Sequence, residues 1–150
     1  MNNTDLLAKQ VSIFLENKSG RLAEVCTTLG EHEINIRALC IADTSDFGIL
    51  RLIVNDPDRA VEVLQAAGFS VGSTGVLALR VPDVPGGLGM VLNALQVRDV
   101  NVEYMYAFFT VVDGDAVVLF KVHDDALDDT LAVLEEAGVG IIPGPEVQGL

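Results

Sequence analysis

The sequence is poor in positive charge. Only nine of its 150 residues are Lys or Arg, against 22 Asp and Glu, so the formal net charge is -13. Binding to nucleic acid or to an anionic membrane surface needs clustered Lys and Arg that neutralise phosphates. The composition therefore argues against nucleic acid and membrane as partners, and the acidic surplus suits a protein that must stay in solution.

The sequence also lacks a segment that would insert into a membrane. No stretch approaches the ~20 apolar residues that a spanning helix needs. The N-terminal residues Met1 to Asp5 have neither the basic start nor the long apolar run of a secretory signal peptide. With only two cysteines, Cys26 and Cys40, we expect a cytoplasmic protein with reduced thiols. Cys26 falls on the apolar side of a predicted helix, so we expect it in the core.

Motifs for catalysis and for metal binding are scarce. No Ser- or Cys-centred arrangement supplies a nucleophile, a base and an oxyanion donor together. The glycines at 86–89 lack the Lys and Ser/Thr of a phosphate loop. His32 and His123 stand far apart, with no Cys or carboxylate at ligand spacing. We therefore expect a protein that is not an enzyme and that uses neither a metal nor a cofactor.

Apolar residues make up 50% of the chain, which is ample for a packed core. Val11, Ile13 and Leu15 alternate with other residues and predict a strand with one buried face. Apolar positions 22, 25, 26 and 29 have the spacing of an amphipathic helix. The first half predicts the order β-α-β-β-α-β, over residues 9–16, 19–32, 33–43, 48–55, 57–68 and 69–73, with a hairpin turn at 44–46.

The same order returns in the second half, over residues 76–81, 88–97, 100–111, 116–122, 124–138 and 139–142, with a hairpin turn at 113–115. A constant spacing of 66 residues relates key positions of the two halves: Gly20 and Gly86, Leu22 and Leu88, Asn35 and Asn101. Two copies of one unit are a firmer inference than any single helix. We expect the boundary near 73–75 and two domains, 1–74 and 75–150.

These elements predict an α+β fold of two ferredoxin-like βαββαβ units in tandem, each an antiparallel sheet with both helices on one face. The second strands, which begin at Glu33 and Val100, are largely apolar on both sides. A sheet face open to water would be polar. We therefore expect this face to be covered, by another copy of the chain in a homodimer or higher homo-oligomer, or by a partner enzyme.

The doubled unit resembles a tandem pair of ACT domains, the amino-acid-sensing modules of many biosynthetic enzymes. The resemblance rests on a Gly-containing turn followed by a strand with Asn between two apolar residues. The turn occurs at 16–22 and again at 83–88, and the strand starts at 34–36 and again at 100–102. The resemblance covers about residues 9–142. Since no catalytic domain accompanies it, the chain most resembles the stand-alone tandem members.

The resemblance implies a free amino acid bound between paired ACT units, where the turn after the first strand meets the second strand of a neighbouring unit. One implied set of ligand-binding residues is Asn17, Ser19, Gly20, Arg21, Leu22 and Asn35. The other set is Asp83, Pro85, Gly86, Gly87, Leu88 and Asn101. The chemistry agrees, because a helix N-terminus offers free N–H groups to a carboxylate and a glycine lets the ligand approach the backbone.

The sequence departs from the family pattern at several positions. Ser19 stands where the family usually has Pro, and Gly87 and Asp83 replace the Arg21 and Asn17 of the first copy. Glu33 and its counterpart Asp99 stand where Gly often precedes the Asn. If that position needs a positive φ, each costs about 1 kcal/mol. We expect the two sites to be chemically unequal.

Two functions remain open from the sequence. The first is a regulator that binds a free amino acid and relays its occupancy to a partner enzyme or pathway. The second is a ligand-free interaction subunit that docks on a biosynthetic enzyme through its apolar sheet face. The glycines of the turns can also be ordinary turn residues, and the two Asn can serve only the backbone.

Overall fold

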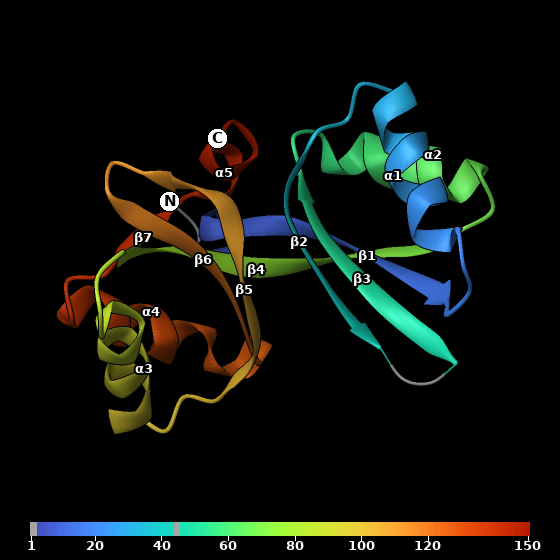
Figure 1. The fold of residues 1–150 in the computed structure, drawn as a ribbon. Coiled ribbons are helices and arrows are strands. Elements are labelled where there is room, and N and C mark those ends of the chain that lie inside the picture. Colours follow the sequence, from blue (N-terminus) through green and yellow to red (C-terminus); the bar gives the residue numbers. More distant parts are fainter. Residues whose placement is uncertain (1–2, 44–45) are drawn as a thin grey trace. The chain divides into compact units, whose positions relative to one another are not determined.

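The computed structural model describes residues 3–43 and 46–150, and Figure 1 shows its helices and strands. Its contacts divide the chain into two compact units. We call residues 9–74 with 148–150 the first unit, and residues 3–8 with 75–147 the second unit. The sequence-based division at 1–74 and 75–150 instead places residues 3–8 in the first domain and residues 148–150 in the second.

The first unit has the β-α-β-β-α-β order. Its elements are β1 (Leu7–Glu16) from Lys9 onward, α1 (Arg21–Glu31), β2 (Ile36–Asp43), β3 (Phe47–Val54), α2 (Pro57–Ala66) and the beginning of β4 (Ser70–Pro82). β3 pairs antiparallel with both β1 and β2. β1 also pairs with β4. Residues 44 and 45 of the predicted hairpin turn lie outside the described residues.

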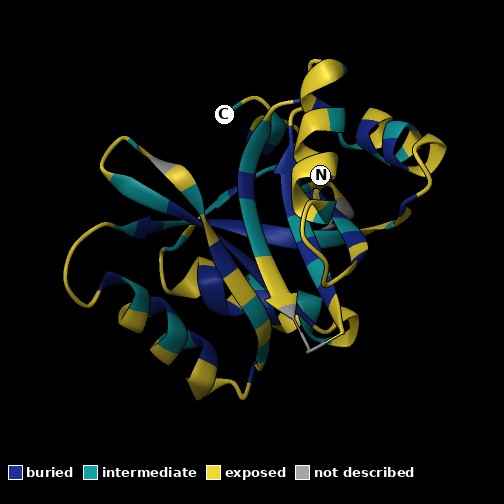
Figure 2. Cartoon of the chain, turned by 45° about the vertical axis from the view of Figure 1, so that its right-hand side comes forward, coloured by how far each residue is buried: buried dark blue, intermediate teal, exposed yellow. Residues whose placement is uncertain are grey.

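Both helices of the first unit cover the same face of its sheet. The buried core takes alternate strand residues together with one stripe from each helix. It includes Val11, Ile13, Leu15, Leu50, Leu52 and Val54 from the strands, and Val25, Leu29, Ala60 and Leu64 from the helices. Figure 2 shows these buried segments in dark blue, while the outer surfaces of the helices are exposed.

The second unit repeats this arrangement. After the short 3-10 helix η1 (Asn3–Leu6), it contains the rest of β4, α3 (Gly87–Val97), β5 (Val102–Val112), β6 (Asp115–Val122), η2 (Asp124–Ala126), α4 (Leu127–Glu136), β7 (Gly140–Ile142) and α5 (Gly144–Gln148). β6 pairs antiparallel with β4 and β5, and β7 pairs with β4. Its core joins residues such as Leu79 and Phe120 of the strands to Val91 and Leu134 of the helices.

Two predictions about these elements are wrong, and one helix was not predicted. β4 is one strand, although Ser73, Thr74 and Gly75 are residues typical of turns. Helix α5 has only five residues, too few to produce a helical hydrophobic period. Cys26 is exposed rather than in the core, because one residue turns a helix by about 100° and α1 buries Val25 instead. Cys40 is half-buried, and burial raises the pKa of its thiol.

The turns repeat as closely as the helices. Glu33 and Asp99 both have positive φ, 59° and 55°, two residues before Asn35 and Asn101. The hairpin turn at Asp113-Gly114 also has positive φ at both residues, 51° and 81°, as a tight two-residue hairpin requires. No helix in the described part of the chain is long and apolar enough to cross a membrane.

Candidate functional site

The turn between β1 and α1 leaves the start of the helix open. Gly20 precedes the helix in the left-handed conformation, with φ 88°, and no side chain caps α1. The backbone N–H of Asn17 donates to the Asp46 carbonyl at 2.9 Å, and that of Arg21 donates to the Lys18 carbonyl at 3.3 Å. The turn is therefore held by backbone hydrogen bonds, one within the turn and one to the residue before β3, and the next N–H groups of the helix remain available to an anion.

A pocket of about 130 Å³ lies beside this turn. The ends of β1, β2 and β3 and the start of α1 form its wall. It is lined by Leu15, Glu16, Asn17, Lys18, Arg21, Leu22, Ile41 and Gly48. The structure thus brings together three residues of the first predicted set, Asn17, Arg21 and Leu22. The volume is below the ~300–1,000 Å³ of a typical ligand pocket, so it suits a small metabolite or part of one.

The pocket carries charges of both signs. Lys18 Nζ lies 2.8 Å from a carboxylate oxygen of Glu16. The hydrogen bond from Lys18, followed by the charge of Lys18, holds the pKa of the Glu16 carboxyl below its usual value. Glu16 is therefore ionised at neutral pH. A zwitterion could find an anionic group for its ammonium and cationic groups for its carboxylate within this one turn.

Arg21 is held by two further residues of the first unit. Its Nη1 donates to a carboxylate oxygen of Glu24 at 2.8 Å, and its guanidinium carbon lies 4.7 Å from the centre of the Phe69 ring. Within the described residues, the buried Nε of Arg21 has no hydrogen-bond acceptor. The guanidinium therefore has more donors than its surroundings use.

The other members of the first set do not line the pocket. Ser19 and Gly20 lie in the turn and are exposed. Asn35 precedes β2 at the opposite end from Ile41, so about 20 Å of strand separates it from the pocket. Its backbone N–H donates to the Asn55 side chain at 2.9 Å, and its carbonyl accepts from the Asn55 N–H at 3.2 Å. Within its own unit, Asn35 thus joins the backbone of β2 to the end of β3.

The turn of the second unit has the same backbone but different chemistry. Gly86 has φ 82° before the uncapped α3, and the N–H of Asp83 donates to the Gly114 carbonyl at 3.4 Å. Asp83, Pro85 and Gly86 are exposed, whereas Gly87 is buried.

Packing explains why Gly87 is buried and lacks a side chain. A Cβ at this position would overlap the carbonyl oxygen of Pro82. The neighbouring Leu88 packs against the core of the second unit. Asn101 precedes β5, again at the end of the unit away from the turn. Since the positions of Lys18 and Arg21 are taken by Val84 and Gly87, the second turn has no cation.

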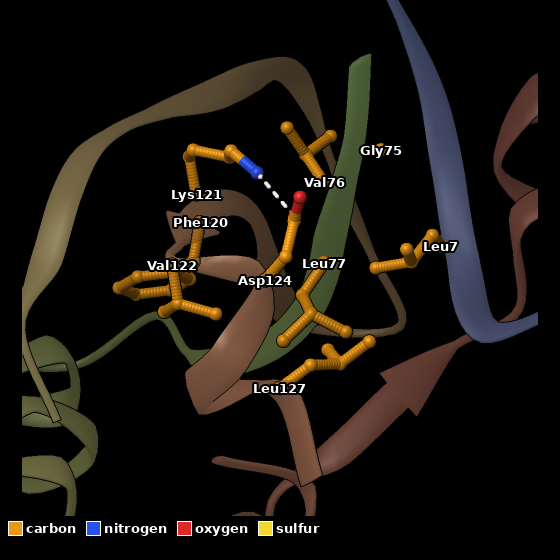
Figure 3. A pocket seen from close by; sticks show the side chains of 9 residues that line it. All are labelled: Leu7, Gly75, Val76, Leu77, Phe120, Lys121, Val122, Asp124 and Leu127. Carbon is orange, nitrogen blue, oxygen red and sulfur yellow. Dashed lines mark hydrogen bonds and ion pairs between the residues drawn. The ribbon is translucent and has the colours of Figure 1, made fainter. Parts of the chain in front are cut away.

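Two other cavities are poorer candidates for a small anionic ligand. Figure 3 shows the side chains around a cavity beside Leu7 and Leu77. Its volume of about 10 Å³ has room for about one water. In its lining, Lys121 Nζ lies 3.1 Å from Asp124 Oδ1. An open groove of about 490 Å³ lies between α1 and α2. Its charged residues are Glu31 and Glu62, and His32 Nδ1 already bonds the Thr28 carbonyl at 2.9 Å. No group of three or more possible metal ligands occurs among the described residues.

The sequence-based set omitted several residues that shape the first pocket. Ile41 and Gly48 reach it only through the pairing of β2 with β3. Phe69 follows α2, far along the chain from Arg21. The spacing of Arg21 and Glu24 is a signal that could have been read from the sequence, since residues three apart are neighbours on a helix.

Comparison with known proteins agrees with this architecture. The protein BT0572 from Bacteroides thetaiotaomicron is 42% identical in sequence, with a TM-score of 0.89 over 98% of this chain and 99% of that one. The ligand-free regulatory subunit of aspartate kinase from Thermus thermophilus is 13% identical, with a TM-score of 0.64 over 87% of this chain and 93% of that one. The latter likeness shows a shared fold alone. No curated protein matches the chain.

The family model for an ACT domain pair matches residues 6–142. This range contains both β-α-β-β-α-β units and both Gly-containing turns. The chain therefore belongs to the ACT domain pair family.

Proposed function

We propose that this protein is a non-catalytic regulator that binds a free amino acid at the turn of its first unit. The observation that carries the proposal is the pocket at the open start of α1, where Asn17 and Arg21 lie beside the apolar Leu15, Leu22 and Ile41. Membership of the ACT domain pair family supports an amino acid as the ligand.

The proposed contacts follow from the groups in the pocket. The carboxylate of the ligand lies at the start of α1, where free N–H groups and the positive end of the helix dipole favour an anion. The ammonium faces Asn17 and Glu16, which offer oxygen acceptors. A paired ACT unit completes the site, as the family resemblance implies. We expect weaker binding at the second turn, where Asp83 repels a carboxylate and no cation attracts it.

Occupancy of the site favours the paired state by the difference in affinity between the two states. The proposed readout is a homodimer or higher homo-oligomer that acts on a partner enzyme or pathway. We place this role in the cytoplasm, because Cys26 and Cys40 are both free thiols.

Isothermal titration calorimetry against each of the twenty amino acids tests the proposal. We expect heat and a raised melting temperature for at least one of them. Asn17→Ala should weaken this binding about tenfold, the effect of losing a hydrogen bond to a charged group. The matched change in the second turn, Asp83→Ala, should leave it unchanged. The absence of heat and of a melting shift with all twenty would contradict the proposal.

A second candidate function is an interaction subunit without a ligand. Phe14 lies between the core residues Ile13 and Leu15, so it points away from the helices, and it is 56% exposed. Phe47, which pairs with Glu16 on the neighbouring strand, is 62% exposed. Exposed aromatic residues of this kind suit a protein partner. This function predicts co-purification of an enzyme that is lost in Phe14→Ser and is indifferent to amino acids.

A further inference from the structure

We propose that Arg21 binds the carboxylate of the amino acid and that Glu24 competes with this carboxylate for the guanidinium. The Arg21–Glu24 ion pair then sets the affinity of the first site. This inference rests on the proposed function, and it adds the residue that recognises the ligand's charge and the residue that limits the affinity.

Helix physics does not account for an arginine at this position. Arg21 is the first residue of α1, where the positive end of the helix dipole disfavours a cation. The order Arg before Glu along a helix is also the less favourable one for an ion pair. The second unit forms the equivalent helix α3 with Gly87 in this place. Positions that break a local rule in this way are often functional.

The guanidinium of Arg21 has binding capacity in reserve. A carboxylate commonly accepts two parallel N–H bonds from arginine. Glu24 takes a bond from Nη1 at 2.8 Å, while the buried Nε has no acceptor among the described residues. Stacking on Phe69, at 4.7 Å from the ring centre, keeps the guanidinium beside the pocket. Nε shares one edge of the guanidinium with Nη2, and because Nε is buried, the side chain must turn away from Glu24 before these two groups can donate together to a carboxylate at the start of α1.

Glu24 is a weak competitor. Its side chain is 57% exposed, and exposed ion pairs are screened by water and stabilise little. A ligand carboxylate that also accepts N–H bonds from the helix start can therefore displace it. The displacement lowers the affinity of the site by the strength of the lost pair. Removing the charge of Glu24 should therefore tighten binding.

The test titrates each of the twenty amino acids into the wild-type protein and three variants by calorimetry. Glu24→Gln should bind the same amino acid about 1.5- to 5-fold more tightly, the range expected for an exposed ion pair. Arg21→Gln should bind it about tenfold more weakly or worse. Arg21→Lys should fall between wild type and Arg21→Gln, because lysine keeps the charge but cannot form the two parallel bonds.

Glu136→Gln is a matched control. Glu136 also accepts from an arginine at 2.8 Å, Arg98, and is similarly exposed, but it lies in the second unit. This variant loses the same charge as Glu24→Gln and should bind as the wild type does. A ligand analogue with a carboxamide in place of the carboxylate separates recognition from folding. It should bind the wild type more weakly than the amino acid, and this preference should be several-fold smaller in Arg21→Gln, where only the start of α1 still favours an anion.

The outcomes separate the inference from the proposed function. If the wild type binds an amino acid and Glu24→Gln binds it no more tightly than Glu136→Gln, the competition is overturned. If Arg21→Gln binds as the wild type does and still prefers the carboxylate, Arg21 is not its receptor. If no protein binds any amino acid, the proposed function fails, and the inference fails with it.

Discussion

Two acidic residues adopt a backbone conformation that favours glycine. Glu33 and Asp99 follow α1 and α3 with φ of 59° and 55°. Their N–H groups donate to the Gly30 and Gln96 carbonyls at 3.1 and 3.0 Å, so they complete the turns that end the two helices. An L-residue in this region is strained by its Cβ. Neither side chain is buried, so packing gives no compensation.

We predict that Glu33→Gly and Asp99→Gly each raise the free energy of unfolding by about 0.5–1 kcal/mol, because relief of strain exceeds the added freedom of the unfolded chain. Urea denaturation of the two variants measures this. Glu62→Gly, at an exposed position inside α2, is the control and should lower the free energy of unfolding by about 1 kcal/mol. Destabilisation by all three changes would show that the positive φ is not strained.

At the scale of an element, α3 shows how packing restricts the second turn. The helix starts so close to the end of β4 that a Cβ at Gly87 would overlap the Pro82 carbonyl. The side chain that binds Glu24 in the first unit therefore has no equivalent here. Gly89, two residues further along the same helix, has open space around it. Packing against Pro82 thus requires a glycine at position 87, whereas the space around Gly89 would admit a side chain.

We predict opposite effects for alanine at these two glycines. Gly87→Ala should lower the free energy of unfolding by about 1–3 kcal/mol, because β4 or α3 must shift to admit the methyl group. Gly89→Ala should raise it by about 0.5–1 kcal/mol, because alanine is the better helix former and meets no neighbour. Thermal and urea denaturation measure both. Equal effects of the two changes would contradict the close contact with Pro82.

At the scale of the whole molecule, the two units exchange their terminal segments. Leu7 packs against the core of the second unit, and Ala8 is fully buried. Val147 of α5 is also fully buried. The second unit is therefore completed by residues from the far end of the chain, and a cut between 74 and 75 does not separate two complete units.

We predict that a fragment of residues 75–150 melts on the order of 10 °C below the whole chain, since it lacks the apolar area that Leu7 and Ala8 bury. Leu7→Ala in the whole chain should lower the free energy of unfolding by about 1–2 kcal/mol, because this side chain is only partly buried. Differential scanning calorimetry measures both. A fragment that melts with the whole chain would show that residues 3–8 contribute nothing to the second unit.

The sequence by itself determined the doubled β-α-β-β-α-β order and the two turns that start α1 and α3. These features depend on neighbours a few residues apart: alternation in strands, the period of helices, and glycine where φ is positive. The family pattern, which often has Gly at the positions of Glu33 and Asp99, pointed to the positive φ that both residues have. The local patterns did not locate Cys26, whose exposure depends on which stripe of α1 faces the sheet.

Only the tertiary structure decided which residues share a site. Asn17, Arg21 and Leu22 meet Ile41 and Gly48 because β3 pairs with both β1 and β2, whereas Asn35 ends up at the far end of its unit. The physical reason is that strand register and helix packing join residues distant in sequence, and no local periodicity records which distant residues will meet.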